Sequence, residues 1–78
     1  MKSTQYFLAM RRRADRAEIR EEWIQRAIDH PIKESLKADG RIRLWTLVAE
    51  MDGRYLRVIM LPDRETVHNA FFDRSFKP

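Results

Sequence analysis

The chain contains no cysteine, only two glycines and three prolines, and no long hydrophobic run. Without cysteine, neither a disulfide nor a thiolate metal site can add to the stability of a core, and nothing indicates an oxidising compartment. No apolar stretch approaches the roughly 20 residues that a membrane span needs, and the N-terminus lacks the long apolar region of a signal peptide. We therefore expect a cytoplasmic protein with no membrane partner.

The scarce residues also exclude several kinds of chemistry. Two glycines cannot form a phosphate-cradling loop, and the few serines and threonines show no nucleophile motif. The histidines are His30 and His68, and without cysteine they cannot build a standard zinc site. We therefore expect neither a metal nor a cofactor, and neither serine-hydrolase nor P-loop chemistry.

The length of 78 residues leaves room for one small α+β domain, residues 1–78, with a single core. A domain of this size buries only a modest fraction of its surface. A homodimer is therefore expected, because a second copy would add buried area.

Arginine is the residue that the chain has in abundance. Of its 16 basic residues 12 are arginine, and the formal net charge is +4. A guanidinium pairs bidentately with phosphate and stacks on bases, so this composition favours a nucleic-acid or an acidic protein partner. The charge is uneven, because residues 14–40 are acidic on balance whereas residues 1–13 and 41–78 carry the excess of base.

Residues 41–72 predict an antiparallel meander, because β-branched and aromatic residues are frequent there and two turn signals divide them. The three expected strands span residues 41–51, 54–61 and 65–72. The turns contain Asp52-Gly53 and Pro62-Asp63: glycine accepts a positive φ, and proline presets the first central position of a turn.

Alternation along these strands predicts which side chains share a face. In the third strand it puts Val67, Asn69 and Phe71 on the face opposite to His68 and Ala70. The central strand is largely apolar on both faces. A terminal segment or a partner chain should therefore cover the second face of the sheet.

The clearest helix begins at Asp15, which we expect to be the N-cap, with Glu18 at the third helical position completing a capping box. Apolar residues then recur with helical spacing as far as Ile28, so this amphipathic helix should lie across the sheet. The helix should end near Asp29, because Pro31 disfavours helical dihedrals at the residue before it.

Two segments are ambiguous. Tyr6–Met10 is apolar and is either a first strand or the opening of a helix. Ile32–Asp39 is either another helical turn or a loop that returns to the sheet. The predicted fold is α+β, with one main amphipathic helix, and a short second one as the alternative, on a three- or four-stranded antiparallel sheet.

Four arginines enter the predicted sheet, at Arg41, Arg43, Arg54 and Arg57. Arg41 and Arg43 share one face of the first strand, and Arg54 and Arg57 lie on its hairpin partner. Such a cluster can hold an RNA backbone and stabilise a pentacovalent phosphate.

Aromatic and further basic residues extend this candidate site. Trp45 and Tyr55 are candidate stacking platforms for bases. The run Arg11-Arg12-Arg13 before the helix is either a phosphate contact or a solvated linker. The alternative for the sheet arginines is a purely structural one, in which they pair across strands with the carboxylates of Glu50, Asp52 and Glu65.

His68 is the candidate proton carrier. It neighbours Asn69 on a strand, and in a basic cleft an imidazole can move a proton at neutral pH. The alternative is a packed or solvated strand histidine. His30 stands at the predicted helix end, where a cationic imidazole suits the helix dipole, so we assign it a structural role.

Several motifs together resemble a known family. These are R-x-D-x-x-E-I-x-x-x-W-I, a proline about one helix later, D-G-R-I-R-x-W, G-R-Y-L-R-V and T-V-H-N-A-F-F-D-R. In this order, over Arg13 to Arg74, they resemble a bacterial domain-of-unknown-function family of short proteins that looks related to the BrnT and RelE-like toxins.

The resemblance implies a fold of one or two helices on an antiparallel sheet. It also implies RNA as the substrate, often on the ribosome, and a small antitoxin protein as the partner. For this chain we expect a metal-independent endoribonuclease or RNA-binding domain in which Arg57 polarises phosphate and His68 carries the proton. A non-enzymatic interaction module or homodimer that uses an exposed sheet face or edge is the alternative.

Overall fold

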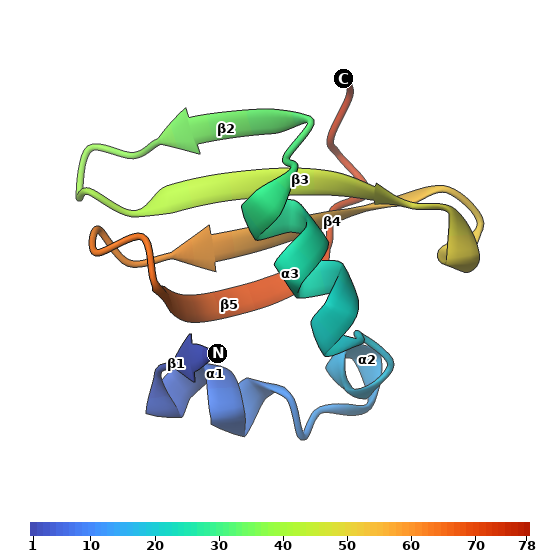
Figure 1. Ribbon diagram of the computed structural model, residues 1–78. Helices are drawn as coiled ribbons and strands as arrows, with labels where there is room; N and C mark the ends of the chain where they lie inside the picture. Colours follow the sequence, from blue (N-terminus) through green and yellow to red (C-terminus); the bar gives the residue numbers. More distant parts are fainter.

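The computed structural model describes all 78 residues as three short helices and a five-stranded sheet (Figure 1). In chain order the elements are β1 (Lys2–Ser3), α1 (Gln5–Met10), α2 (Ala14–Ala17), α3 (Glu21–Asp29), β2 (Lys33–Leu36), β3 (Ile42–Val48), the 3₁₀ turn η1 (Ala49–Met51), β4 (Arg54–Met60) and β5 (Thr66–Phe72). None of the helices has the length and apolar character that crossing a bilayer requires.

The sheet has the strand order β1-β5-β4-β3-β2 and is mixed. β2, β3, β4 and β5 pair antiparallel, as the meander predicts, but β1 pairs parallel to β5. The expectation of a purely antiparallel sheet of three or four strands is therefore wrong in strand number and in the direction of one edge. β1 has two residues, too few for alternation to show in the sequence.

The predicted helix from Asp15 is divided into two. Asp15 lies inside α2 and is not an N-cap, Glu18 ends α2, and neither α2 nor α3 has a side-chain N-cap hydrogen bond. Between them Ile19 is 3% exposed, so the break lets the chain bury this side chain before α3 begins. The end of α3 at Asp29, just before Pro31, agrees with the prediction.

Tyr6–Met10 belongs to a helix, which settles one ambiguity. Thr4 is the N-cap of α1, and its Oγ1 accepts a hydrogen bond from the backbone N–H of Phe7 at 3.1 Å. The Phe7 side chain is buried in the core. α1 thereby closes the β5 side of the sheet (Figure 1).

Residues 33–36 form strand β2, so the expectation of a helical turn or a loop there is wrong. β2 pairs antiparallel with β3 in a register that sets Ser35 opposite Arg43. The turn between them needs Gly40, whose φ is +88° and whose missing Cβ would lie 3.0 Å from Cγ of Pro62. The four-residue strand has little apolar alternation of its own, and its hydrogen bonds come from β3.

A β-bulge in β5 corrects the predicted alternation. Ile59 pairs with Asn69 but Met60 pairs with Val67, so His68 is the extra residue without a partner on β4. Val67 and Ala70 are both buried, although three positions apart. The sequence-based assignment of Val67 to the face opposite Ala70 is therefore wrong.

The core lies between α3 and the sheet. Its members are Phe7, Ile19, Trp23, Ile24, Ala27, Ile42, Leu44, Val48, Leu56, Val58, Met60, Val67 and Ala70. α3 crosses β3 and β4 diagonally on this one face (Figure 1). The other face of the sheet carries no helix.

Candidate functional site

The predicted functional side chains lie mostly on the sheet face opposite α3, which we call the open face. Strand register sets Lys33, Trp45, Arg57 and Phe71 side by side across it, and a second row contains Ser35, Arg43, Ile59 and Asn69. Arg41, Leu47, Tyr55 and His68 complete this face. Its basic side chains come from three strands, which is how the fold gathers them.

Cations and aromatic rings alternate along the first row. The guanidinium of Arg16 lies over the Phe71 ring at 5.1 Å, and that of Arg57 lies 4.7 Å from the same ring and 5.7 Å from Trp45. The ring of Phe76 stacks on that of Trp45, with 4.9 Å between the ring centroids. The rings and guanidiniums therefore form a continuous series of contacts across the sheet.

Asp73 anchors this row from the end of β5. Its Oδ2 accepts a hydrogen bond from Nε1 of Trp45 at 3.0 Å, and its Oδ1 accepts from the backbone and hydroxyl of Ser75. Burial alone would raise the pKa of this carboxyl, but the hydrogen bonds from Trp45 and Ser75 and the charge of Arg57 outweigh it, so the pKa is lowered. Asp73 is therefore ionised at neutral pH.

Arg57, a predicted catalytic residue, is held in this structural network. Its Nε lies 3.2 Å from Oδ2 of Asp73 but makes no hydrogen bond of normal geometry, and its side chain is 20% exposed. The contact between Arg57 and Asp73 is an ion pair. The hydrogen bond to the same carboxylate oxygen, Oδ2, comes from the indole N–H of Trp45. Arg57 can present only part of its guanidinium to a ligand.

The two predicted stacking platforms are partly covered. Trp45 is 6% exposed because Phe76 lies on it, and Tyr55 meets the edge of the same phenyl ring at 5.0 Å. The prediction that something covers the second face is confirmed here for a terminal segment, since residues 73–76 fold over it. Within this segment, Phe76 covers the part of the open face around Trp45 and Tyr55.

His68 sits at the β5 border of the open face. Its Nδ1 lies 3.2 Å from Oγ1 of Thr4, and its ring stacks on Tyr6 at 4.9 Å. Burial, and secondarily the positive charge of Arg41, lower the pKa of His68 from 6.5. The imidazole is therefore neutral at pH 7, the state in which it can accept a proton.

The two predicted catalytic residues share a face but do not touch. No hydrogen bond or ion pair joins His68 to Arg57, since His68 contacts Thr4 and Tyr6 whereas Arg57 contacts Asp73. The bulge turns His68 to the open face, but Arg57 pairs with Phe71, three residues further along β5, so the two side chains remain apart.

The remaining predicted arginines are distributed over several surfaces. Arg43 makes no ion pair, and Arg41 has only a long contact of 3.8 Å to Asp39. Arg54 lies at the other end of β4, 3.9 Å from Glu18. None of the sheet arginines pairs with the three carboxylates named as their structural partners.

The basic run before α2 is not part of the open face. Arg11 donates from Nη2 to the carbonyl oxygen of Ile19 at 2.9 Å, which satisfies a backbone group at the break before α3. Arg13 pairs with Asp15, and Arg12 is exposed without a partner. Of the three, Arg11 therefore has a structural role.

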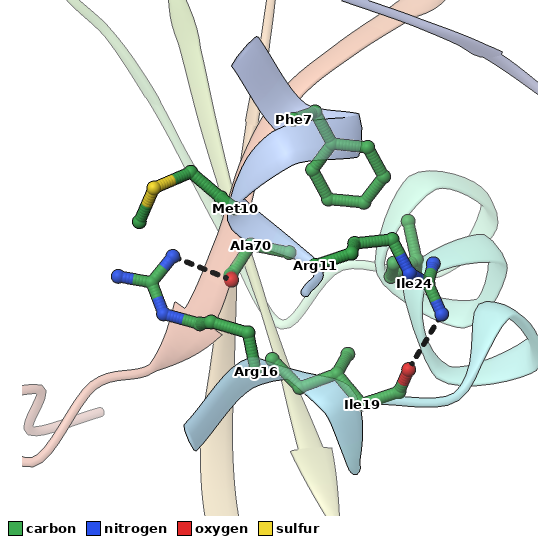
Figure 2. Close-up of a pocket in the computed structure, with 7 residues that line it drawn as sticks. All are labelled: Phe7, Met10, Arg11, Arg16, Ile19, Ile24 and Ala70. Carbon is green, nitrogen blue, oxygen red and sulfur yellow. Dashed lines mark hydrogen bonds between the residues drawn. The ribbon is translucent and has the colours of Figure 1, made fainter. Parts of the chain in front are cut away.

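Figure 2 shows a small apolar gap between α1, α2, α3 and β5, with Arg11 and Arg16 on either side of it. Arg16 donates to the carbonyl oxygen of Ala70 and also to Oδ1 of Asn69, so its guanidinium turns toward the open face. The gap is too narrow to admit a water molecule and holds no ligand site.

Sequence reasoning missed three contributors, Arg16, Asp73 and Tyr6. Arg16 and Tyr6 come from the helices and reach β5 only through the tertiary fold. Asp73 stands inside the T-V-H-N-A-F-F-D-R motif, so its position in that motif was the one available signal. No group of three or more histidine, aspartate or glutamate side chains lies close enough together to hold a metal ion.

No protein-family model, curated protein or solved structure matches this chain. The resemblance to the BrnT and RelE-like toxins accordingly stays a prediction that rests on the motifs.

Proposed function

We propose that the open face binds RNA and that the protein is a toxin-like RNA-binding domain with metal-independent endoribonuclease activity. The observation that carries the proposal is the separation of charge between the two sides of the sheet. The open face presents Lys33, Arg41, Arg43 and Arg57, and its carboxylate, Asp73, is buried. α3, on the opposite side, carries three acids and one base.

Arg43 is the centre of the proposed phosphate contact. It lies between Arg41 and the Trp45 row on β3, it is only partly buried, and it makes no ion pair. An unpaired guanidinium on a flat face can take a phosphate in a bidentate contact without first losing a carboxylate.

His68 supplies the proposed chemistry. In the tautomer that donates from Nδ1 to Oγ1 of Thr4, Nε2 keeps the lone pair that a base needs. Nε2 would then accept the proton of a ribose 2′-hydroxyl as its oxygen attacks the adjacent phosphorus, while Arg57 and Arg43 stabilise the charge on the pentacovalent phosphate. The 5′-oxygen leaves and takes a proton from water, and the products are a 2′,3′-cyclic phosphate and a 5′-hydroxyl.

Binding is tested by the salt dependence of RNA affinity in a matched pair of variants. Arg43→Ala and Arg26→Ala remove the same charge from opposite sides of the sheet. We expect Arg43→Ala to weaken binding and to lower the slope of log K against log salt by about 1, because one phosphate contact is lost. Arg26→Ala, which breaks a pair with Glu50, should leave both nearly unchanged. Equal losses, or an affinity that does not respond to salt, would contradict the proposal.

Cleavage is tested separately with ribosomes and mRNA in EDTA. We expect fragments with the wild type, at least a hundredfold slower cleavage with His68→Ala, given the usual contribution of a general base, and no change with His30→Ala. Binding without any cleavage would reduce the proposal to an RNA-binding domain.

A second candidate, from a different class, is a homodimer formed through the edge of β2. Lys37 donates from its N–H to the carbonyl of Arg41, so by antiparallel alternation Glu34 and Leu36 direct their main-chain groups away from β3. Leu36 is 70% exposed and Ile32 51% exposed beside this open edge.

A second copy fits this edge in register. A two-fold axis at Ser35 would pair Glu34 with Leu36 of the partner in both directions, giving a continuous sheet of ten strands. Light scattering should then report a dimer for the wild type and a monomer for Leu36→Lys, with Leu8→Lys as the control at another exposed leucine. A monomeric wild type at high concentration would remove this candidate.

A further inference from the structure

The segment that follows β5 occupies part of the open face in a specific way. The Phe76 ring lies nearly parallel to that of Trp45, at 4.9 Å and 16°, and meets Tyr55 edge-on at 64°. An aromatic ring that stacks on one platform and contacts a second at its edge has the placement of a nucleobase in a single-strand binding site.

Trp45 does not depend on Phe76 for its orientation. Its indole N–H is held by Asp73, whose own backbone N–H continues the β-ladder by donating to the carbonyl of Tyr55 at 2.8 Å. By contrast, no hydrogen bond joins residues 76–78 to the rest of the protein. Phe76 can therefore leave the platform while Trp45, Asp73 and Tyr55 stay in place.

A hollow next to Phe76 supplies positive charge. It has a volume of about 310 Å³ and is lined by Arg54, Tyr55, Phe72, Asp73, Arg74 and Phe76. Arg74 makes no ion pair, and Arg54 has only its 3.9 Å contact with Glu18. The volume is at the lower end of what small-ligand pockets have, and departure of the phenyl ring would enlarge it.

We propose that Trp45 and Tyr55, with Arg54 and Arg74 beside them, form a subsite for one nucleotide of single-stranded RNA, and that Phe76 occupies the base position of this subsite in the free protein. The inference rests on the proposed RNA binding and identifies where an unpaired base is held. The base stacks on Trp45, and its phosphate contacts the two guanidiniums in the hollow.

The arrangement explains why a single strand fits and a duplex does not. A base reaches the Trp45 ring only when it is unstacked from its neighbours, as in loops and single strands. Phe76 must leave before a base can bind. The apparent RNA affinity of the subsite is therefore its intrinsic affinity multiplied by the fraction of time that Trp45 is uncovered. Removal of the phenyl ring should remove this penalty.

The test compares Phe76→Ala with the wild type for binding of a fluorescent ten-residue oligoadenylate. We expect Phe76→Ala to bind three- to tenfold more tightly, because the base no longer competes with the ring. Leu47→Ala, which removes an exposed apolar side chain from the same face, is the control and should leave the affinity within twofold. Trp45→Ala should weaken the binding by both proteins.

A second measurement keeps the inference testable if Phe76→Ala is unstable. In the wild type, the ring resonances of Phe76 should move toward their random-coil positions as oligoadenylate is added, because the base displaces the ring from Trp45. Phe76 resonances that stay unchanged while RNA binds would overturn the inference.

The outcomes also separate the inference from the proposed function. If the wild type binds RNA in an Arg43-dependent manner but Phe76→Ala binds no more tightly, the subsite is wrong and the RNA-binding proposal stands. If neither protein binds RNA at any salt concentration, both are wrong. Tighter binding by Phe76→Ala that is lost with Trp45→Ala supports both.

Discussion

The two faces of the sheet use the same strands for different purposes. On the α3 side, most alternate residues of β3 and β4 are apolar and buried, among them Leu44, Val48, Leu56 and Val58. On the open face, the intervening positions carry guanidiniums and rings, with Arg57 between Trp45 and Phe71. The first face is held by burial, and the second by specific pairwise contacts.

This difference shows which side chains of the open face are available to bind a ligand. A residue in the core has no alternative partner, whereas Arg43 and His68 make few contacts and remain accessible from one side. The row that contains Arg57 is intermediate, because its cations already stack on rings and pair with Asp73. Among the cations of the open face, Arg43 makes no ion pair and is available to a ligand, whereas Arg57 can contribute only the exposed part of its guanidinium.

The largest effect should come from a leucine pair on the two faces. Leu56→Ala removes a fully buried side chain under α3 and should lower the free energy of unfolding by about 3 kcal/mol, through lost burial and the cavity left behind. Leu47→Ala removes the same atoms from the open face, where Leu47 is 43% exposed, and should cost less than about 1 kcal/mol. Urea denaturation of both variants checks this. Similar losses would mean that the open face is covered more tightly than the contacts indicate.

The next effect concerns the anchor of the open face. Asp73→Ala leaves the N–H of Trp45 without its acceptor and Arg57 without its counter-charge, and should cost about 2 kcal/mol. Near-ultraviolet circular dichroism should report a loss of signal as Trp45 becomes mobile. Asp29→Ala, at the exposed end of α3, is the control. If the two aspartate variants are equally stable, Asp73 does not anchor the row.

Acid should reduce the stability of the α3 side through Glu50. The side-chain hydrogen bond from Arg26 lowers the pKa of Glu50 from 4.5 to about 2, so the folded state binds this proton less readily than the unfolded chain. The stabilisation is complete above pH 4.5 and is lost as the pH falls toward 2. Unfolding measured between pH 6 and pH 2 should therefore depend less steeply on pH in Glu50→Gln than in the wild type. Identical slopes would contradict the assigned pair.

A second carboxyl, that of Asp63, should also contribute to the loss of stability in acid. Hydrogen bonds from Thr66 and Glu65 lower the pKa of Asp63 from 3.8 to about 2, with the same sign. Asp63→Asn should reduce the acid slope independently of Glu50→Gln, since Asp63 lies in the β4–β5 turn. Additive changes in slope are expected because the two sites share no partner.

The smallest effect concerns His68. Arg41→Gln removes the positive charge that helps to lower the pKa of His68, so the pKa measured by NMR should rise but stay below 6.5, because burial is the larger cause. Lys77→Gln, which removes a charge at the far end of the chain, should leave it unchanged. A His68 pKa that does not respond to Arg41→Gln would place the Arg41 side chain away from the histidine.

The strands could be predicted because their signals are local. β-Branched residues, the Asp52-Gly53 turn and the Pro62-Asp63 turn lie within a few residues of one another, and β3, β4 and β5 follow them closely. β2 and β1 could not be predicted in this way. β2 is recognisable only by its partner β3, and β1 has two residues that gain their hydrogen bonds from β5, more than sixty positions away.

The candidate site divides in the same way. Alternation along β3 correctly places Arg41 and Arg43 on one face, and the same face contains Trp45. The bulge at His68, the cover over Trp45 and the pairing of Arg57 with Asp73 all depend on contacts across strands or with the segment after β5. No local pattern encodes them.

The sequence by itself determined the α+β character, the three long strands, the end of α3 and the excess of arginine, since each depends on residue type and short-range spacing. The tertiary structure alone decided which arginines remain free, because a guanidinium is paired or unpaired according to which carboxylates the fold brings within 4 Å. It also decided where His68 lies, since the extra residue in β5 turns His68 to the open face, three residues along β5 from the partner of Arg57. Partners that are distant in the chain leave no periodicity in it.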